Sequence, residues 1–245
     1  MLSNKVKRFF KTAEARAEGS LFRVVLDERP IRTPEGSDLV FPTLALATHV
    51  AEEWSEQEDE IKPLTMPIMR LACTAVDKVA PVREQVIDQL VRYGESDLVC
   101  YRSTEPDDLI ALQNETWQPV LDWLDHSHGI KLNVTHGIVH VAQPQDALVR
   151  LAKRIAVYND FELAGLGELT QLTGSLALAL ACMSGELSGD AVFLASQLDD
   201  DWQADKWGED SEAVERRKNL QADISAAVQF IEKLGGVTAD HAGER

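Results

Sequence analysis

The first forty residues alternate between short apolar runs and turn-forming residues. Residues 21–26, 31–33 and 39–41 are short β-rich runs, and the turns predicted between them, at 27–30 and 34–36, contain Pro, Gly and Asp. Short apolar runs separated by such residues are typical of a β-meander. Because two or three strands are not stable alone, another element must cover their apolar face. Thr43, a suitable N-cap, precedes apolar residues at helical spacing, which predicts a covering helix over 44–57.

The rest of the chain has mostly the spacing of amphipathic helices. After an apolar stripe over 68–76, helices are predicted over 82–93, 107–125, 145–157, 162–181, 189–207 and 213–234, with an extended segment over 131–141. Gly94 is expected just past the end of its helix. The helix over 162–181 is apolar on nearly all sides, which predicts a central place in the core.

These elements together predict an α+β protein. A small N-terminal α+β domain over residues 1–62 would hold an antiparallel sheet covered by a helix. A larger, mostly helical bundle domain would follow over residues 63–245.

Composition and charge narrow the classes of partner. The chain has 245 residues, of which 41 are Asp or Glu and 24 are Lys or Arg, so its net charge is -17. Such an excess of negative charge repels phosphate backbones and anionic lipids, which argues against nucleic-acid binding and membrane docking. It favours solubility and basic or apolar protein partners. No apolar run reaches the ~20 residues of a membrane span, so we expect no stable membrane insertion. The chain is also expected to be monomeric on its own.

The usual signatures of enzymes and cofactor sites are missing. Cys73, Cys100 and Cys182 are distant from one another and odd in number, which predicts reduced thiols, with Cys182 in the core. No glycine loop for phosphates and no GxSxG motif is present, so we expect neither ATP binding nor a catalytic residue. His136 and His140 would share a face, but the sequence supplies no third ligand and favours a plain histidine pair over zinc. No cofactor is expected.

An acidic cluster over residues 199–215 supports one enzymatic alternative. On a helix, Asp201 and Asp205 would lie on one face beside Asp200, and could bridge magnesium as in helical isoprenoid synthases. Such enzymes also need a second metal motif and nearby arginines for diphosphate. Around this cluster the chain offers only Lys206 before Arg216. An acidic helical Mg-dependent enzyme of the isoprenoid type is therefore kept as the alternative function.

The same cluster contains Trp202 and Trp207 among its carboxylates. If these indoles are exposed, they are apolar anchors within a charged rim, an arrangement typical of protein interfaces. If they pack inward, the acids are simply a solvated face. The composition supports both interpretations equally.

A series of short motifs in fixed order resembles a known family. The motifs are RFFK at 8–11, VLD at 25–27 with RP at 29–30 and TP at 33–34, EW at 53–54 with Gln57, Pro63 with MP at 66–67, SDLVCYR at 96–102, Gln113 with Trp117 and Trp123, GSLALA at 174–179, and LDDDWQ at 198–203 with WG at 207–208. This series resembles the ATP synthase assembly chaperones that bind the alpha subunit of the catalytic head. The family usually has glycine where this chain has Glu28, which leaves the type of that turn open.

The resemblance implies a non-enzymatic chaperone that holds the free alpha subunit. Such a protein would shield the alpha-subunit interface until the beta subunit replaces it. The partner-binding residues implied by the C-terminal motif and its neighbour are Asp200, Asp201, Trp202, Trp207, Gly208 and Glu209. Because the chain has no long Arg- and Ser-rich presequence, a bacterial cytoplasm is favoured, with the mitochondrial matrix expected for a eukaryotic source.

Overall fold

A three-stranded antiparallel sheet forms one end of the molecule in a computed structural model that describes residues 6–208 and 210–235. Its strands are β1 (Ala13–Glu18), β2 (Leu21–Leu26) and β3 (Arg29–Pro30), in the order β1-β2-β3. Ala13 lies opposite Leu26 and Glu18 opposite Leu21. Phe41 adds an isolated bridge to Phe22. The predicted strand over 21–26 is therefore confirmed. The next strand, β3, lies at 29–30, within the predicted turn, and not at 31–33, and 39–41 contributes only this bridge.

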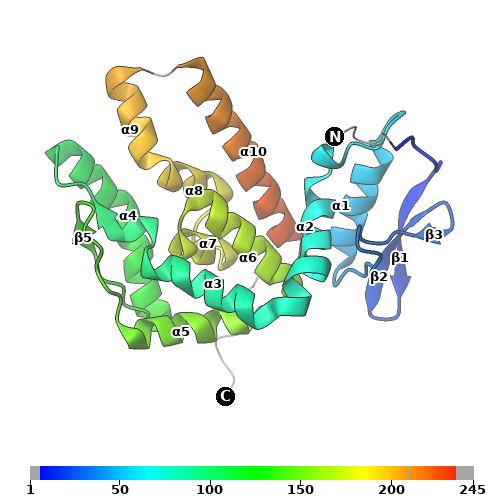
Figure 1. Ribbon diagram of the computed structural model, residues 1–245, viewed down its shortest axis with the longest axis horizontal. Helices are drawn as coiled ribbons and strands as arrows, with labels where there is room; N and C mark the ends of the chain where they lie inside the picture. Colours follow the sequence, from blue (N-terminus) through cyan, green and yellow to red (C-terminus); the bar gives the residue numbers. More distant parts are fainter. Residues whose placement is uncertain (1–5, 209, 236–245) are drawn as a thin grey trace.

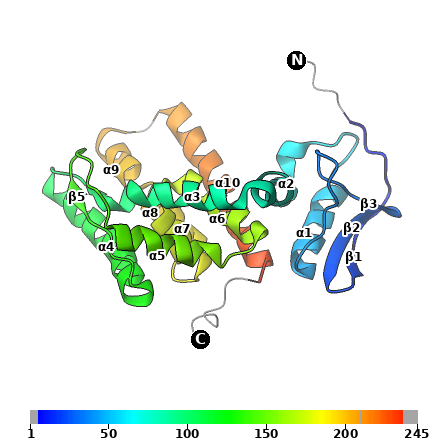
Figure 2. The same ribbon diagram turned by 60° about the horizontal axis from the view of Figure 1, so that its bottom comes forward.

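Helix α1 (Leu44–Ser55) covers one face of the sheet (Figure 1 and Figure 2). The Thr43 hydroxyl accepts a hydrogen bond from the Leu46 amide at 3.2 Å, as predicted for an N-cap. The predicted sheet covered by a helix is confirmed. Strand β1 was not predicted, because the small side chains of Ala13 and Ala15 face α1 in place of the β-branched residues that mark most strands.

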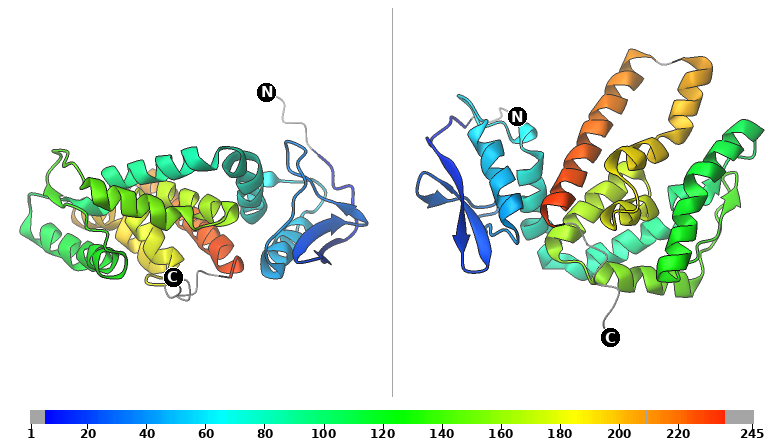
Figure 3. Two further views of the ribbon diagram at one scale, coloured as in Figure 1. Left: turned by 90° about the horizontal axis from the view of Figure 1, so that it is seen from below. Right: turned by 180° about the vertical axis from the view of Figure 1, so that it is seen from behind.

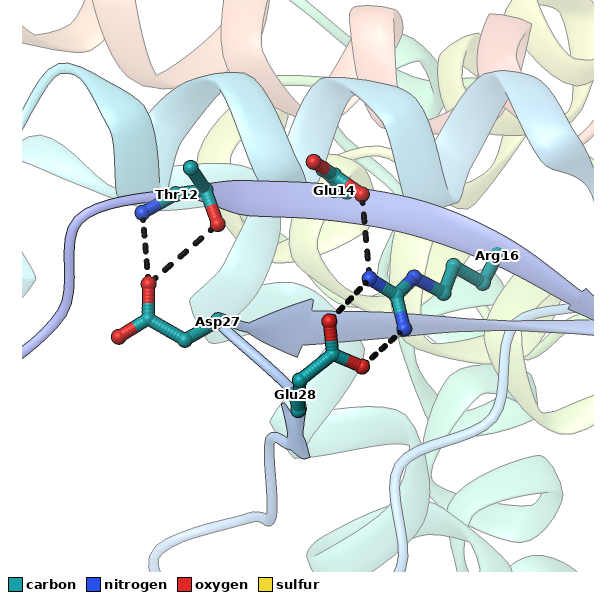
Figure 4. A network of polar contacts seen from close by, with 5 residues as sticks. All are labelled: Thr12, Glu14, Arg16, Asp27 and Glu28. Atoms are coloured by element: carbon teal, nitrogen blue, oxygen red, sulfur yellow. Dashed lines mark hydrogen bonds and ion pairs between the residues drawn. The ribbon is translucent and has the colours of Figure 1, made fainter.

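The turn between β2 and β3 explains how Glu28 is tolerated. Asp27 takes the positive φ of 56°, and Glu28 does not. The Asp27 carboxylate accepts from the backbone amides of Lys11 and Thr12, both at 3.0 Å, and these bonds lower its pKa. Arg16 donates to both Glu28 oxygens, at 2.7 and 3.1 Å (Figure 4). The left-handed position is thus at Asp27, one residue before Glu28.

Trp54 packs where α1 meets the chain before β1. It is half-buried, belongs to the smaller core and contacts the Phe10 ring edge-on at 5.7 Å between centroids. Because its removal leaves a cavity, Trp54→Ala is expected to lower the free energy of unfolding by about 3 kcal/mol. Urea denaturation measures this loss. A change below about 0.5 kcal/mol, the scale of ordinary surface substitutions, would contradict the assigned packing.

The other elements are mostly helices (Figure 3). They are α2 (Pro67–Thr74), α3 (Arg83–Glu95), α4 (Asp107–His128), α5 (Gln145–Ala156), α6 (Asp160–Thr173), α7 (Leu176–Met183), α8 (Gly189–Ser196), α9 (Leu198–Trp207), α10 (Ser211–Lys233) and the parallel strands β4 (Tyr101–Arg102) and β5 (Thr135–His136). Short 3-10 and π turns lie at 63–65, 75–82 and 98–100. No helix in the described ranges is long and apolar enough to cross a membrane.

Two predicted helices are each divided in the structure. The segment over 162–181 breaks into α6 and α7 because Gly174 takes a φ of 68° and Ser175 caps α7 through the Leu178 amide. Its predicted central place is confirmed, since nearly every α7 residue is buried. The segment over 189–207 breaks into α8 and α9 at Gln197. Gly94 lies inside α3, not past its end, and a Cβ there would meet Leu151 of α5 at 2.7 Å.

Two apolar cores run through the described residues. The smaller one joins the sheet, α1 and α2 with Phe230 of α10, and the larger one joins the remaining helices. Phe161 contacts both cores, with its ring 6.3 Å from Phe41 and 6.4 Å from Phe230. Ile68 and Leu71 of α2 lie in the smaller core. The division into residues 1–62 and 63–245 stays a prediction.

Candidate functional site

Helices α4, α8, α9 and α10 line a groove on the surface of the protein. Helices α9 and α10 extend away from the bundle, with α4 beside α9 and α8 at the base (Figure 1 and Figure 3). The groove between them has a volume of about 990 Å³. Its apolar lining includes Leu112 of α4, Leu194 of α8, Trp202 of α9 and Val214 of α10.

Three aliphatic side chains of this groove are exposed to solvent. Leu112 is 39% exposed, Leu194 56% and Val214 48%. Each comes from a different helix, so the apolar surface exists only in the folded chain. Several aliphatic side chains gathered in one hollow and rimmed by charges are characteristic of a binding surface for another protein.

An ion pair joins α9 to α10 at the side of the groove. Arg217 donates from Nε and Nη2 to the two oxygens of Asp201, both at 2.7 Å. The same guanidinium lies 4.7 Å from the centre of the Phe193 ring of α8. This two-point pair fixes the direction in which α9 leaves the bundle.

The pair also bears on the magnesium alternative. Both Asp201 oxygens accept from Arg217, so this carboxylate is not open toward a metal beside Asp205. Within residues 6–208 and 210–235, no three His, Cys, Asp or Glu side chains converge as metal ligands would. These contacts give no support to a magnesium site at Asp201 and Asp205.

The two tryptophans of α9 differ in their surroundings. Trp202 is half-buried, packs against the larger core and has the Lys206 ammonium 5.2 Å from its ring centre. Lys206 also bonds Asp108 of α4 at 3.1 Å, which lowers the pKa of that carboxyl. Trp207 meets Trp202 edge-on at 5.6 Å and is 74% exposed. Trp202 thus anchors α9 and lines the groove, whereas Trp207 faces solvent.

The predicted partner-binding residues lie on two sides of α9. Asp201 and Trp202 line the groove. Asp200, Trp207 and Gly208 line a second hollow of about 550 Å³ between α9 and α10, and Asp201 borders both. Residues 200, 203 and 207 have the helical spacing of one stripe, which explains this division. Glu209 lies outside the described residues.

A polar network holds the start of α9 on α4. Gln113 donates to Asp199 at 2.7 Å and accepts from the Ser103 amide at 2.7 Å. Partial burial raises the pKa of Asp199. The buried Arg102 guanidinium lies 5.0 Å from the centre of the Trp117 ring below this network. These contacts position the helix that carries the predicted site.

The histidines and cysteines among the described residues do not line the groove. His136 bonds the Ser103 carbonyl and His140 the Tyr101 hydroxyl, each at 3.2 Å, so the two rings have separate partners. Burial raises the pKa of Cys73 and of Cys182 to about 11. Thiols with such pKa values are protonated at neutral pH and unreactive, as predicted for Cys182.

The sequence analysis did not identify the aliphatic part of the groove. Leu112 and Leu194 stand among other apolar residues of their helices, so their sequence pattern matches that of a core. The sequence offered one sign of this surface at Val214, which is the only large aliphatic residue between Trp207 and Leu220 and is followed by charged side chains.

Comparison with known proteins agrees with this architecture. The family model for the ATP12 chaperone protein matches residues 7–125. The mitochondrial atp12 protein of Schizosaccharomyces pombe is 23% identical over 252 residues, covering 96% of this chain and 87% of that protein. Two solved structures of Atp12 from Paracoccus denitrificans, one of them an aspartate-to-lysine mutant, are 35% identical. Each covers 94% of this chain and 98% of its own, with a TM-score of 0.89. The chain belongs to the ATP12 chaperone family.

Membership of the ATP12 chaperone family confirms the resemblance found in the sequence. The Atu1473 protein of Agrobacterium tumefaciens, 39% identical over 93% of this chain and 86% of its own, has the same fold with a TM-score of 0.88. The predicted α+β fold and the predicted non-enzymatic chaperone are confirmed. The magnesium-dependent enzyme alternative was wrong.

Proposed function

We propose that this ATP12-family chaperone assists assembly of the ATP synthase catalytic head by binding the free alpha subunit. It shields the alpha-subunit interface until the beta subunit replaces it. A subunit made before its partner exposes an apolar interface and is prone to aggregate. The observation that carries this proposal is the groove of exposed Leu112, Leu194 and Val214, a surface that can cover such an interface. The net charge of -17 keeps the chaperone itself soluble.

The proposed contact includes Asp200, Asp201, Trp202, Trp207, Gly208 and Glu209. Trp207 supports this assignment, because a large exposed indole beside carboxylates is the kind of anchor that concentrates binding energy. The proposed location is the bacterial cytoplasm, or the mitochondrial matrix for a eukaryotic source. The Schizosaccharomyces pombe relative is named as mitochondrial.

Co-expression with ATP synthase subunits tests this function. The tagged chain is expected to keep the alpha subunit soluble and to co-purify with it, and added beta subunit is expected to release the alpha subunit. The beta subunit expressed alone with the tagged chain serves as the control and is not expected to co-purify. Trp207→Ala is expected to weaken capture about tenfold or more without lowering the melting temperature. Absence of the alpha subunit from the purified fraction would contradict the proposal, and full capture by Trp207→Ala would remove Trp207 from the site.

A further inference from the structure

The two long walls of the groove carry opposite free charges. Asp205 lies on the α9 wall and Lys218 on the α10 wall, and both are exposed groove-lining residues. Neither forms an ion pair with another described residue. The Asp201–Arg217 pair between the same helices is already neutralised. The groove therefore presents a negative edge along α9 and a positive edge along α10.

Apolar side chains line the space between these walls. Ala191, Ala195 and Ala204 contribute only methyl groups to it, while Leu112, Leu194 and Val214 project into solvent from three sides. On α10 the lining extends from Val214 to Gln221, about 10 Å at the rise of an α-helix. This length matches about two helical turns of an occupant lying along the groove.

The walls determine which kind of segment can bind. A peptide that binds by β-strand addition needs a free strand edge, and all four walls are helices whose interior backbone groups are already bonded. A small ligand is oriented by converging polar groups, and the unpartnered buried polar atoms of the described residues all lie outside the groove lining. An amphipathic helix needs only an apolar trough with suitable edges, which the groove supplies.

We propose that the groove binds one amphipathic helix of the partner, with a basic edge against Asp205 and an acidic edge against Lys218. The identity of the partner as the alpha subunit rests on the proposed function. The apolar face of that helix covers Leu112, Leu194 and Val214. Opposite charges on the two edges fix the direction in which the bound helix runs along the groove, because the reversed direction, with the same apolar face inward, places like charges together.

Photo-crosslinking tests where the partner helix lies. Benzophenylalanine, which is apolar, is placed at Val214 and separately at Leu112, and the control position is Val157, which is 69% exposed and lies outside the groove. In the complex with the alpha subunit, both groove positions are expected to crosslink to the apolar face of one helical segment, and position 157 is not. Capture of the alpha subunit without groove crosslinks, or crosslinks to an extended segment, would overturn this inference and leave the proposed function standing. Failure of the unsubstituted chain to capture the alpha subunit would instead overturn the proposed function.

Charge reversal tests the orientation. Asp205→Lys and Lys218→Glu are each expected to weaken capture at least tenfold. The matched controls Asp88→Lys and Lys153→Glu make the same changes of net charge on exposed residues of α3 and α5, and are expected to stay within twofold. Reversing the facing charge on the crosslinked segment is expected to restore capture by Asp205→Lys. Equal losses in the groove and control variants, or no rescue, would contradict the assigned edges.

Discussion

Replacing Asp97 with alanine is expected to lower the free energy of unfolding by about 3–5 kcal/mol at neutral pH. Asp97 is fully buried and lies just before the 3-10 turn at 98–100. One carboxylate oxygen accepts from the Ser175 hydroxyl at 2.6 Å and the Val99 amide at 3.2 Å, and the other accepts from the Ala177 amide at 2.9 Å. Alanine would leave these donors without a partner in the dry core at the start of α7.

A second variant tests the hydrogen bonds of Asp97 from the donor side. Ser175→Ala removes one donor to Asp97 and the cap of the Leu178 amide, so a smaller loss of about 1–2 kcal/mol is expected. Both variants are compared with the wild type by urea denaturation. A loss below about 1 kcal/mol for Asp97→Ala would contradict the central structural role of this carboxylate.

The cost of Asp97→Ala is also expected to depend on pH. Burial raises the pKa of Asp97 to about 6, although the hydrogen bonds from Ser175 and the backbone amides act in the opposite direction. Because an unfolded aspartate has a pKa of about 3.9, the folded protein binds the proton more tightly. This contribution to stability is fully present below about pH 4 and is lost as the pH rises through about 6. The difference between wild type and Asp97→Ala is therefore expected to be larger at pH 4.5 than at pH 7.5.

Asp97 also illustrates what the sequence could predict. The motifs at 96–102 and 174–179 were recognised separately, and the structure joins them through the bond between Asp97 and Ser175. Likewise, Glu53 accepts from the amides of Ile68 and Met69 at 2.8 and 2.7 Å and so connects two motifs at the start of α2. Burial raises the pKa of Glu53 to about 7. Helical spacing reveals apolar faces, but it carries no information on a carboxylate that caps a distant helix.

The candidate site was predictable only where its residues are neighbours in the sequence. The run of acids and indoles in α9 is local in the sequence, and it was recognised there. The division of its residues between two faces depends on where α9 lies against α4 and α10, which the contacts of Gln113 and Arg217 determine. The break at Gly174 had a local signal, a left-handed glycine followed by the N-cap Ser175, which the continuous apolar spacing outweighed in the prediction. The break at Gln197 had no such signal in the sequence.

Replacing Leu194 with aspartate is expected to weaken alpha-subunit binding about 100-fold, since an interface anchor is worth 2 kcal/mol or more and each ~1.4 kcal/mol is a factor of ten. Leu194 projects from α8 into the groove, where a bound helix would bury the new carboxylate against apolar atoms. Because the side chain is 56% exposed in the free protein, stability is expected to change by no more than about 0.5 kcal/mol. Val157→Asp makes the same type of change outside the groove and is the matched control.

The most direct test of the groove as the binding surface compares three chaperone proteins: the wild type, Leu194→Asp and Val157→Asp. The quantity measured is the dissociation constant of each for the alpha subunit. Each chaperone is immobilised, the purified alpha subunit is titrated over it, and melting temperatures are recorded in parallel. We expect wild type and Val157→Asp to agree within twofold, and Leu194→Asp to bind about 100-fold more weakly with an unchanged melting temperature. Equal affinities for Leu194→Asp and wild type, with both proteins folded, would contradict the account.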